Sequence, residues 1–170
     1  VVGRDLSNTD LRGMELTGVK FIDCDLRGAA FDDTDFHQVS FRSCQMQGAT
    51  FTSARFGVGD GAFTISPLIR CDLGGADFSD AQLVRINITT CSLNGARFTG
   101  AQIAGRLQSV DFTGCDFTGT HVSAHVGIGD CVLDEHAPEA LHEAQGKEVA
   151  DRERARQNRM RNDLAAKDTP

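Results

Sequence analysis

Large apolar residues recur every five positions along most of this chain. One series runs from Leu6 to Phe56, a second from Leu68 to Ile103, and a third from Phe112 to Val122. Ten of the eleven phenylalanines occupy these positions, which we call position i, and the residue two before each is usually small. This period fits neither a strand with alternating faces nor a helix with apolar residues at i, i+3 and i+4.

A five-residue period is typical of a chain that turns a corner every five residues. One large and one small side chain then point inward on each side, and the other three point outward. Four sides close one coil, and stacked coils share backbone hydrogen bonds at roughly 4.8 Å per step. Because large residues lie beside small ones, the interior can fill without voids. The pattern therefore predicts a four-sided β-solenoid.

Four-sided coils of constant length should place like residues in columns. One side repeats Gly-Ala before its large residue. Another side carries five cysteines whose separations along the chain are unequal: the second and fourth separations are longer than the first and third. Aligning both columns requires seven extra residues after Phe56 and four after Ile103, which predicts loop insertions near residues 57–67 and 104–109. The expected core residues are Cys24, Ala29, Phe31, Cys44, Ala49, Phe51, Cys71, Ala76, Phe78, Cys91, Ala96, Phe98 and Cys115.

The repeats resemble the pentapeptide repeat family, whose consensus is A(D/N)Lxx. Gly75-Ala76-Asp77-Phe78-Ser79, followed by Asp80-Ala81-Gln82-Leu83, is a close match, and the resemblance covers about Arg4 to Val122. The resemblance implies an all-β solenoid, the right-handed quadrilateral parallel β-helix. It specifies a fold much more sharply than it specifies a function.

The chemistry of the chain changes at Pro138. The segment from Glu139 to Lys167 is rich in Ala, Glu, Arg and Gln, which favour helices, and Glu148 with Arg152 is a favourable i, i+4 pair. We therefore expect a β-helix over residues 1–136 and a charged helical tail, a C-terminal α-helical extension, over residues 137–170. The resemblance implies a homodimer through this tail, and a linker to a further domain is the alternative.

Net charge is concentrated in the expected coils. The formal charge is −7; residues 1–136 hold 17 acids and ten bases, whereas residues 137–170 hold seven of each. This distribution gives no basic footprint for direct binding of nucleic acid, and the lack of Trp and Tyr removes the usual base-stacking platforms.

No apolar run is long enough to span a membrane, and no signal peptide opens the sequence. We expect a cytoplasmic protein.

Six cysteines raise the question of disulfides or zinc. Five occupy the small inward position, where stacked Cβ atoms lie farther apart than the ~3.8 Å of a disulfide, so we interpret them as reduced, buried apolar residues. His121, His125, Cys131 and His136 could form a zinc set, but their spacing matches no compact motif. A polar closing cap is the preferred interpretation, and no metal or cofactor is expected.

Outward positions on two sides collect aspartates, which give a rigid rod a negative field. The resemblance to quinolone-resistance and mycobacterial fluoroquinolone-resistance proteins implies a DNA-like rod that binds type II topoisomerase, with two loops that matter for protecting gyrase. The implied partner-binding residues are Asp5, Asp10, Asp25, Asp32, Asp33, Asp72, Asp77, Asp80 and Asp116, with Asp60, Phe63, Arg106 and Leu107 from the two loops. Alternatively, outward aspartates serve solubility and the loops are neutral bulges.

No catalytic constellation is evident in the sequence. The acids fall on a convex surface, and a narrow, filled coil offers no cavity for a substrate. We therefore predict a non-enzymatic protein-binding scaffold. Two hypotheses remain: a DNA-mimicking rod that binds DNA gyrase and confers quinolone or antibiotic protection, and a structural or docking module of a larger bacterial effector or adaptor protein.

Overall fold

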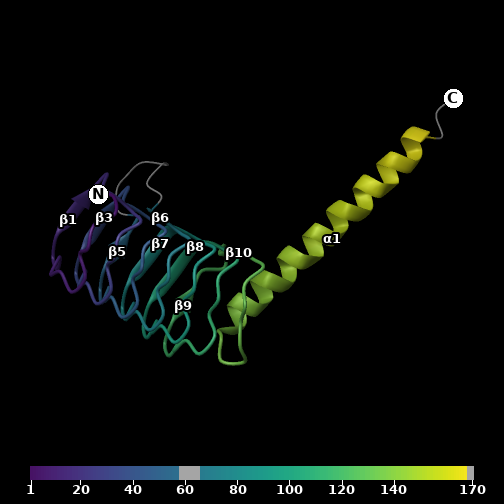
Figure 1. Cartoon of the computed structure of the whole chain (residues 1–170). Coiled ribbons are helices and arrows are strands. Elements are labelled where there is room, and N and C mark those ends of the chain that lie inside the picture. The colour runs from purple at the N-terminus through teal and green to yellow at the C-terminus, as the bar shows by residue number, and fades with distance from the viewer. Residues whose placement is uncertain (58–65, 168–170) are drawn as a thin grey trace.

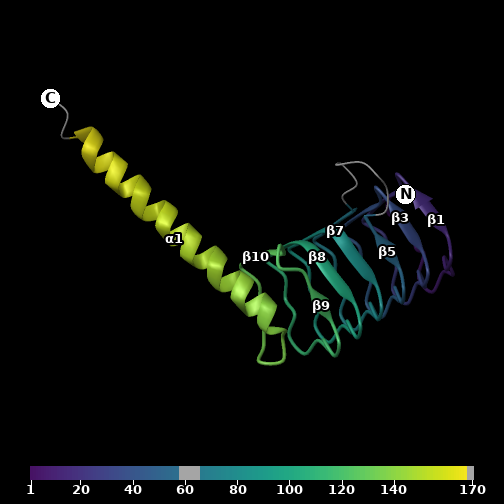
Figure 2. The same cartoon turned by 180° about the vertical axis from the view of Figure 1, so that it is seen from behind.

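The computed structural model describes residues 1–57 and 66–167, which form a rod of stacked coils followed by one long helix (Figure 1). The N-terminus lies at one end of the rod and the helix leaves from the other (Figure 2). The elements are β1 (Glu15–Thr17), β2 (Lys20–Ile22), β3 (Asp35–His37), β4 (Ser40–Arg42), β5 (Arg55–Phe56), β6 (Ser66–Ile69), β7 (Gln82–Thr89), β8 (Gln102–Gln108), β9 (His121–Val122), β10 (Gly127–Gly129) and α1 (Glu139–Lys167).

Each coil has four sides, which we number by the large residue that each carries in the second coil. Sides 1 to 4 carry Leu26, Phe31, Phe36 and Phe41, all of which are buried. Strands form on sides 3 and 4, where β1 pairs with β3 and β2 with β4 in parallel. Sides 1 and 2 are joined to the next coil by isolated parallel bridges. These observations confirm the predicted quadrilateral parallel β-solenoid with a C-terminal helix.

The first predicted insertion agrees with the coil register. Asp25 pairs with Gln45 in the next coil, and Gln45 pairs in turn with Asp72 in the coil after it. The second of these steps along the chain is longer than the first, because seven extra residues enter between sides 3 and 4. Asp60 and Phe63, predicted to bind a partner, lie outside the described residues.

The second predicted insertion is wrong, because the chain there loses a residue instead of gaining four. In the pairing of β7 with β8, the step from Ile88 to Leu107 is one residue shorter than the step from Leu83 to Ile103. The pairing skips Arg85, which sits at a corner of β7 that β8 lacks. Residues 104–108 are thus part of a strand instead of a loop. Leu107, predicted to contact a partner, is only 1% exposed and fills the core of side 4.

The corrected register also moves Cys115. Arg97 pairs with Asp116, so Cys115 follows Ala96 in the alanine column of side 2 instead of following Cys91. Val110 and then Cys131 continue the cysteine column, since Asp111 pairs with both Ser92 and Val132. The prediction of a single column of five cysteines is therefore wrong at Cys115. All six cysteines are buried, and the five that were expected to point inward therefore lie in the core.

Side chains fill the interior of the coils, and all thirteen predicted core residues are buried there. On side 2 the rings of Phe31, Phe51, Phe78, Phe98 and Phe117 form a stack, with neighbouring centroids 4.8 to 5.2 Å apart and nearly parallel planes. This spacing is close to the distance between parallel strands. The backbone register therefore sets the separation of the rings.

Helix α1 closes the last coil and then leaves it. Leu141 is fully buried, the Nε2 of Gln145 donates to the carbonyl oxygen of Cys131 at 2.9 Å, and Arg152 pairs with Asp130 at 2.7 Å. These contacts cover the open end that a solenoid must protect. Beyond Arg152 the helix runs away from the coils (Figures 1 and 2), and every side chain described there is exposed. Within the described chain, no helix has the length and apolarity required to cross a membrane.

Candidate protein-binding surface

Charge is segregated between the sides of the rod. We call the outward side chains of sides 1 and 2 the acidic wall; it holds eleven aspartates, Glu135 and four arginines among the described residues, a net charge of −8. The described parts of sides 3 and 4 hold four acids and six bases, a net charge of +2. The aspartates of the acidic wall are Asp5, Asp10, Asp25, Asp32, Asp33, Asp72, Asp77, Asp80, Asp111, Asp116 and Asp134, and its arginines are Arg4, Arg12, Arg27 and Arg97.

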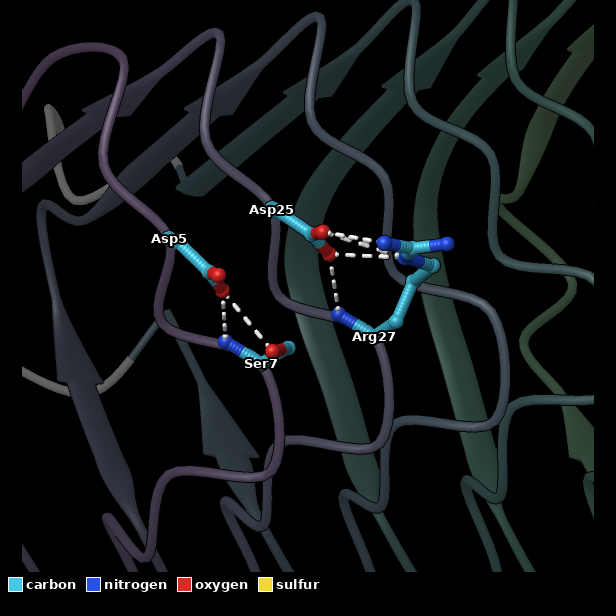
Figure 3. Close-up of polar contacts among 4 residues, drawn as sticks. All are labelled: Asp5, Ser7, Asp25 and Arg27. Atoms are coloured by element: carbon cyan, nitrogen blue, oxygen red, sulfur yellow. Dashed lines mark hydrogen bonds and ion pairs between the residues drawn. The ribbon is translucent and has the colours of Figure 1, made fainter.

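Eight of these aspartates hold the turns of the wall in place. The carboxylate of each accepts a hydrogen bond from the backbone N–H two residues later, at 2.9 to 3.2 Å; the eight are Asp5, Asp10, Asp25, Asp72, Asp77, Asp111, Asp116 and Asp134. Figure 3 shows two of them on successive coils, Asp5 with Ser7 and Asp25 with Arg27. All of them except Asp134 directly precede a large inward residue, and this Asx-turn geometry explains why Asp recurs at that position.

Hydrogen bonds lower the pKa of six of these eight carboxylates and so keep them ionised. The side chain and backbone N–H of Arg12 lower the pKa of Asp10 to about 2. The backbone N–H and hydroxyl of Ser7 lower the pKa of Asp5, and the hydroxyl and backbone N–H of Thr118 lower the pKa of Asp116. A hydrogen bond to the charged form of an acid favours that form. The wall therefore stays negative well below neutral pH.

Three arginines neutralise part of the wall from within. Arg12 pairs with Asp10 at 2.7 Å, Arg27 with Asp25 at 2.5 Å, and Arg97 with Asp77 at 3.5 Å. Among the described residues, the other aspartates of the wall have no lysine or arginine within ion-pair distance. Most of the unpaired charge lies toward the C-terminal end of the rod, at Asp72, Asp80, Asp111, Asp116 and Asp134.

The charge density of the wall can be compared with that of DNA. Six coil steps separate Asp5 from Val132, which is roughly 29 Å at ~4.8 Å per step. A net charge of −8 over this length is one charge per ~4 Å, whereas duplex DNA carries one per ~1.7 Å of its axis. The wall has less than half the linear charge density of a duplex.

The structure brings all nine aspartates of the sequence prediction onto one wall and adds two. Asp111 was missed because the wrong register placed it on side 4, and Asp134 was missed because the repeat series was expected to end at Val122. The repeated pattern Asp111-Phe112-Thr113-Gly114, Asp116-Phe117-Thr118-Gly119 was a signal that could have found Asp111. Arg106 is exposed in β8 but lies on side 4, outside the wall.

The thiols of the rod are unreactive where burial is the main influence on their pKa. Burial raises the pKa of Cys115 to about 12 and also raises the pKa of Cys131. Because the thiolate is the reactive form, these side chains act as small apolar groups. Cys131, considered above as a zinc ligand, lies in the core, and no group of three His, Cys, Asp or Glu residues in the described ranges is placed to hold a metal ion.

Acid is expected to destabilise the coils through the turn aspartates. A lowered folded-state pKa adds stability that is complete above the ordinary value of 3.8 and is lost as the pH falls toward the folded-state value, about 2 for Asp10. The urea midpoint should therefore fall across this window. A variant with Asp25→Asn, Asp111→Asn and Asp116→Asn keeps an acceptor for each turn without titrating, so its midpoint should fall less. Equal falls would show that these turns do not carry the effect.

Comparison with known proteins agrees with this architecture. The family model for pentapeptide repeats matches, in eight copies, residues 3–31, 20–57 and 68–105. Comparison with curated proteins finds no match. Among solved structures, a pentapeptide repeat protein from the thylakoid lumen of Arabidopsis thaliana is 27% identical, with 73% of this chain and 71% of that chain covered and a TM-score of 0.39.

Two further solved structures are similar to this chain over most of its length. QnrB1, a plasmid-mediated fluoroquinolone resistance protein, is 21% identical over 79% of this chain and 74% of its own, with a TM-score of 0.45. HetL, a protein involved in the regulation of heterocyst differentiation in the cyanobacterium Nostoc, is 16% identical over 78% of this chain and 88% of its own, with a TM-score of 0.32. Since the family model covers more than half of the residues, the chain belongs to the pentapeptide repeat family.

Proposed function

We propose that this protein is a non-enzymatic, protein-binding rod whose acidic wall docks into a basic groove that otherwise holds duplex DNA. The most concrete partner is cytoplasmic DNA gyrase, which binding would protect from quinolones. The observation that carries the proposal is the segregation of charge, −8 on sides 1 and 2 against +2 on the described parts of sides 3 and 4. Pentapeptide repeat scaffolds are generally non-enzymatic.

The wall suits such a groove because its charges are fixed in place. Eight carboxylates are tied to their own turns by backbone N–H groups, and their side chains therefore lose little freedom when a partner binds. The arrangement repeats along a straight stack at roughly 4.8 Å per coil. The lower charge density than DNA favours moderate, strongly salt-dependent binding over tight binding.

A second function is favoured by the helix. The part of α1 beyond Arg152 is mostly polar, and residues 153–161 make no described contact with the coils. A largely polar helix of this kind often bridges domains. The rod could then serve as a structural or docking module of a larger effector or adaptor protein. That alternative predicts no effect on gyrase.

A supercoiling assay with gyrase, run with and without a fluoroquinolone, tests the proposal. We expect the protein to inhibit supercoiling or to relieve drug inhibition at micromolar concentration. Replacing Asp72, Asp111 and Asp116 by asparagine should weaken the effect by about tenfold, since each exposed ion pair contributes up to ~1 kcal/mol and ~1.4 kcal/mol is a factor of ten.

The matched control removes three negative charges outside the wall, with Glu15→Gln, Asp23→Asn and Asp35→Asn. This variant should act like the original protein. If the original protein changes supercoiling in neither condition, gyrase is removed as a partner. If both variants lose the effect equally, the total charge matters and the acidic wall does not.

A further inference from the structure

The exposed end of α1 carries the opposite charge to the coils. We call residues 153–161 the arginine arm; it holds Glu153 and four arginines, Arg154, Arg156, Arg159 and Arg161, for a net charge of +3. The preceding part of the helix, residues 139–151, holds four acids and one lysine, a net charge of −3. Charge is thus separated along the helix as well as around the rod.

The charges of the arm are available to another molecule. Arg154 makes a long contact of 3.8 Å with Asp151, and its side chain is still 75% exposed. In the portion of the chain that the structure covers, Arg156, Arg159 and Arg161 have no acidic residue within ion-pair distance. The arm points away from its own coils in both views (Figures 1 and 2), so its own acidic wall is out of reach.

A contact within the chain shows how an arginine of this helix binds the coils. Arg152, one residue before the arm, donates to the carboxylate of Asp130 at 2.7 Å and to Glu148 at 3.1 Å. Charge-assisted arginine–carboxylate bonds of this kind are directional as well as strong. The arm places further arginines along the same helix, where the described coils of its own chain offer no carboxylate partner.

The spacing of the arm matches the spacing of the wall. Arg154 and Arg161 are two helical turns apart, so they lie on the same side of α1, ~10.5 Å apart along its axis. Leu141 and Gln145, which contact the coils, fall roughly on the opposite side. Asp72 and Asp111 are two coil steps apart in one column, with Ser92 between them, which is ~9.6 Å.

We propose that the arginine arm of one copy binds the acidic wall of a second copy, with Arg154 and Arg161 pairing with Asp72 and Asp111. Both aspartates are free of other lysines or arginines among the described residues, and both are held in place by their turns. A nucleic acid is the other polyanion that could attract the arm. The second copy is favoured because the chain carries a net charge of −7, which repels a polyanion, and because the spacings agree.

This self-association would cover the surface assigned above to an external partner. The arm of a neighbouring copy would then compete with that partner, and the free wall would dominate at low protein concentration. The inference itself needs only the charges and spacings of this chain. It can therefore hold even if gyrase is not the partner.

Sedimentation velocity of the full chain tests the contact. We expect reversible association at ~0.1 M NaCl, where the screening length is about 10 Å, and monomers at ~1 M, where it is about 3 Å. The Arg154→Gln, Arg161→Gln variant and the Asp72→Asn, Asp111→Asn variant should each raise the dissociation constant by about tenfold or more, since two ion pairs of up to ~1 kcal/mol each are lost. Asparagine retains the turn acceptor, so the coils should stay folded.

Two controls make the test specific. The Arg156→Gln, Arg159→Gln variant removes the same charge from a different side of the helix and should have a much smaller effect. Mixing the arm variant, which keeps its wall, with the wall variant, which keeps its arm, should restore a complex with a one-to-one composition. A mixture that stays monomeric, equal effects of the two arginine variants, or a monomer at low salt whose arm binds a short DNA duplex would each overturn the proposal.

Discussion

Replacing Phe51 by alanine is expected to lower the free energy of unfolding by about 3–5 kcal/mol. Phe51 is completely buried, and its ring stacks between Phe31 at 5.0 Å and Phe78 at 4.8 Å. The backbone register sets the distance between these rings, so the neighbours cannot close the space that the missing ring leaves. The substitution should therefore cost both the apolar transfer energy and most of the cavity energy.

Urea unfolding followed by circular dichroism measures this loss. Val132→Ala is a suitable control because Val132 is 55% exposed, and an exposed substitution should change stability by less than about 0.5 kcal/mol. A loss of less than ~1 kcal/mol for Phe51→Ala would mean that the coil interior is loosely filled, contrary to the stack described here.

Gly105→Ala should also destabilise the protein strongly. A Cβ atom at this position would lie 2.2 Å from the carbonyl oxygen of Ile86 and 2.9 Å from its backbone nitrogen. The close approach arises where β8 turns from side 3 to side 4 without the corner residue that β7 has at Arg85. Because the obstacle is backbone, we expect a cost above the ~1–3 kcal/mol of ordinary overpacking.

Gly146→Ala provides the contrasting control. A Cβ atom at Gly146, inside α1, would meet nothing within 4 Å, and alanine in a helix is favoured over glycine by about 1 kcal/mol. We therefore expect Gly105→Ala to lower the urea midpoint of unfolding and Gly146→Ala to raise it. If Gly105→Ala leaves the midpoint unchanged, residues 104–109 form a loop after all, and the placement of Asp111 and Cys115 must be revised.

The five-residue period predicted the four sides and the buried core because each position i must point inward on its own side. The seven-residue insertion was also predictable, since two independent columns required it. The four-residue step from Ile103 to Leu107 was not, because a strict five-residue period has no place for a side that is one residue short. Cysteine and alanine both fit the small position, so matching Cys115 to Cys91 gave a plausible but wrong register.

The candidate surface was partly predictable for the same reason. Outward aspartates follow directly from the repeat, but assigning Asp111 to the wall required the correct register. The turn bonds that lower the pKa values of these residues depend on backbone geometry that only the structure supplies. The basic end of the tail was visible in the sequence, whereas its direction away from the coils was not.

Displacement of a labelled DNA duplex from gyrase tests the central claim most directly, because it asks whether the acidic wall occupies the place of DNA. We predict that the protein displaces the duplex in a salt-dependent manner, and that the Asp72→Asn, Asp111→Asn, Asp116→Asn variant does so about tenfold less well. The Glu15→Gln, Asp23→Asn, Asp35→Asn variant should match the original protein. Binding that leaves the duplex in place, or displacement that the wall variant performs equally well, would contradict the account.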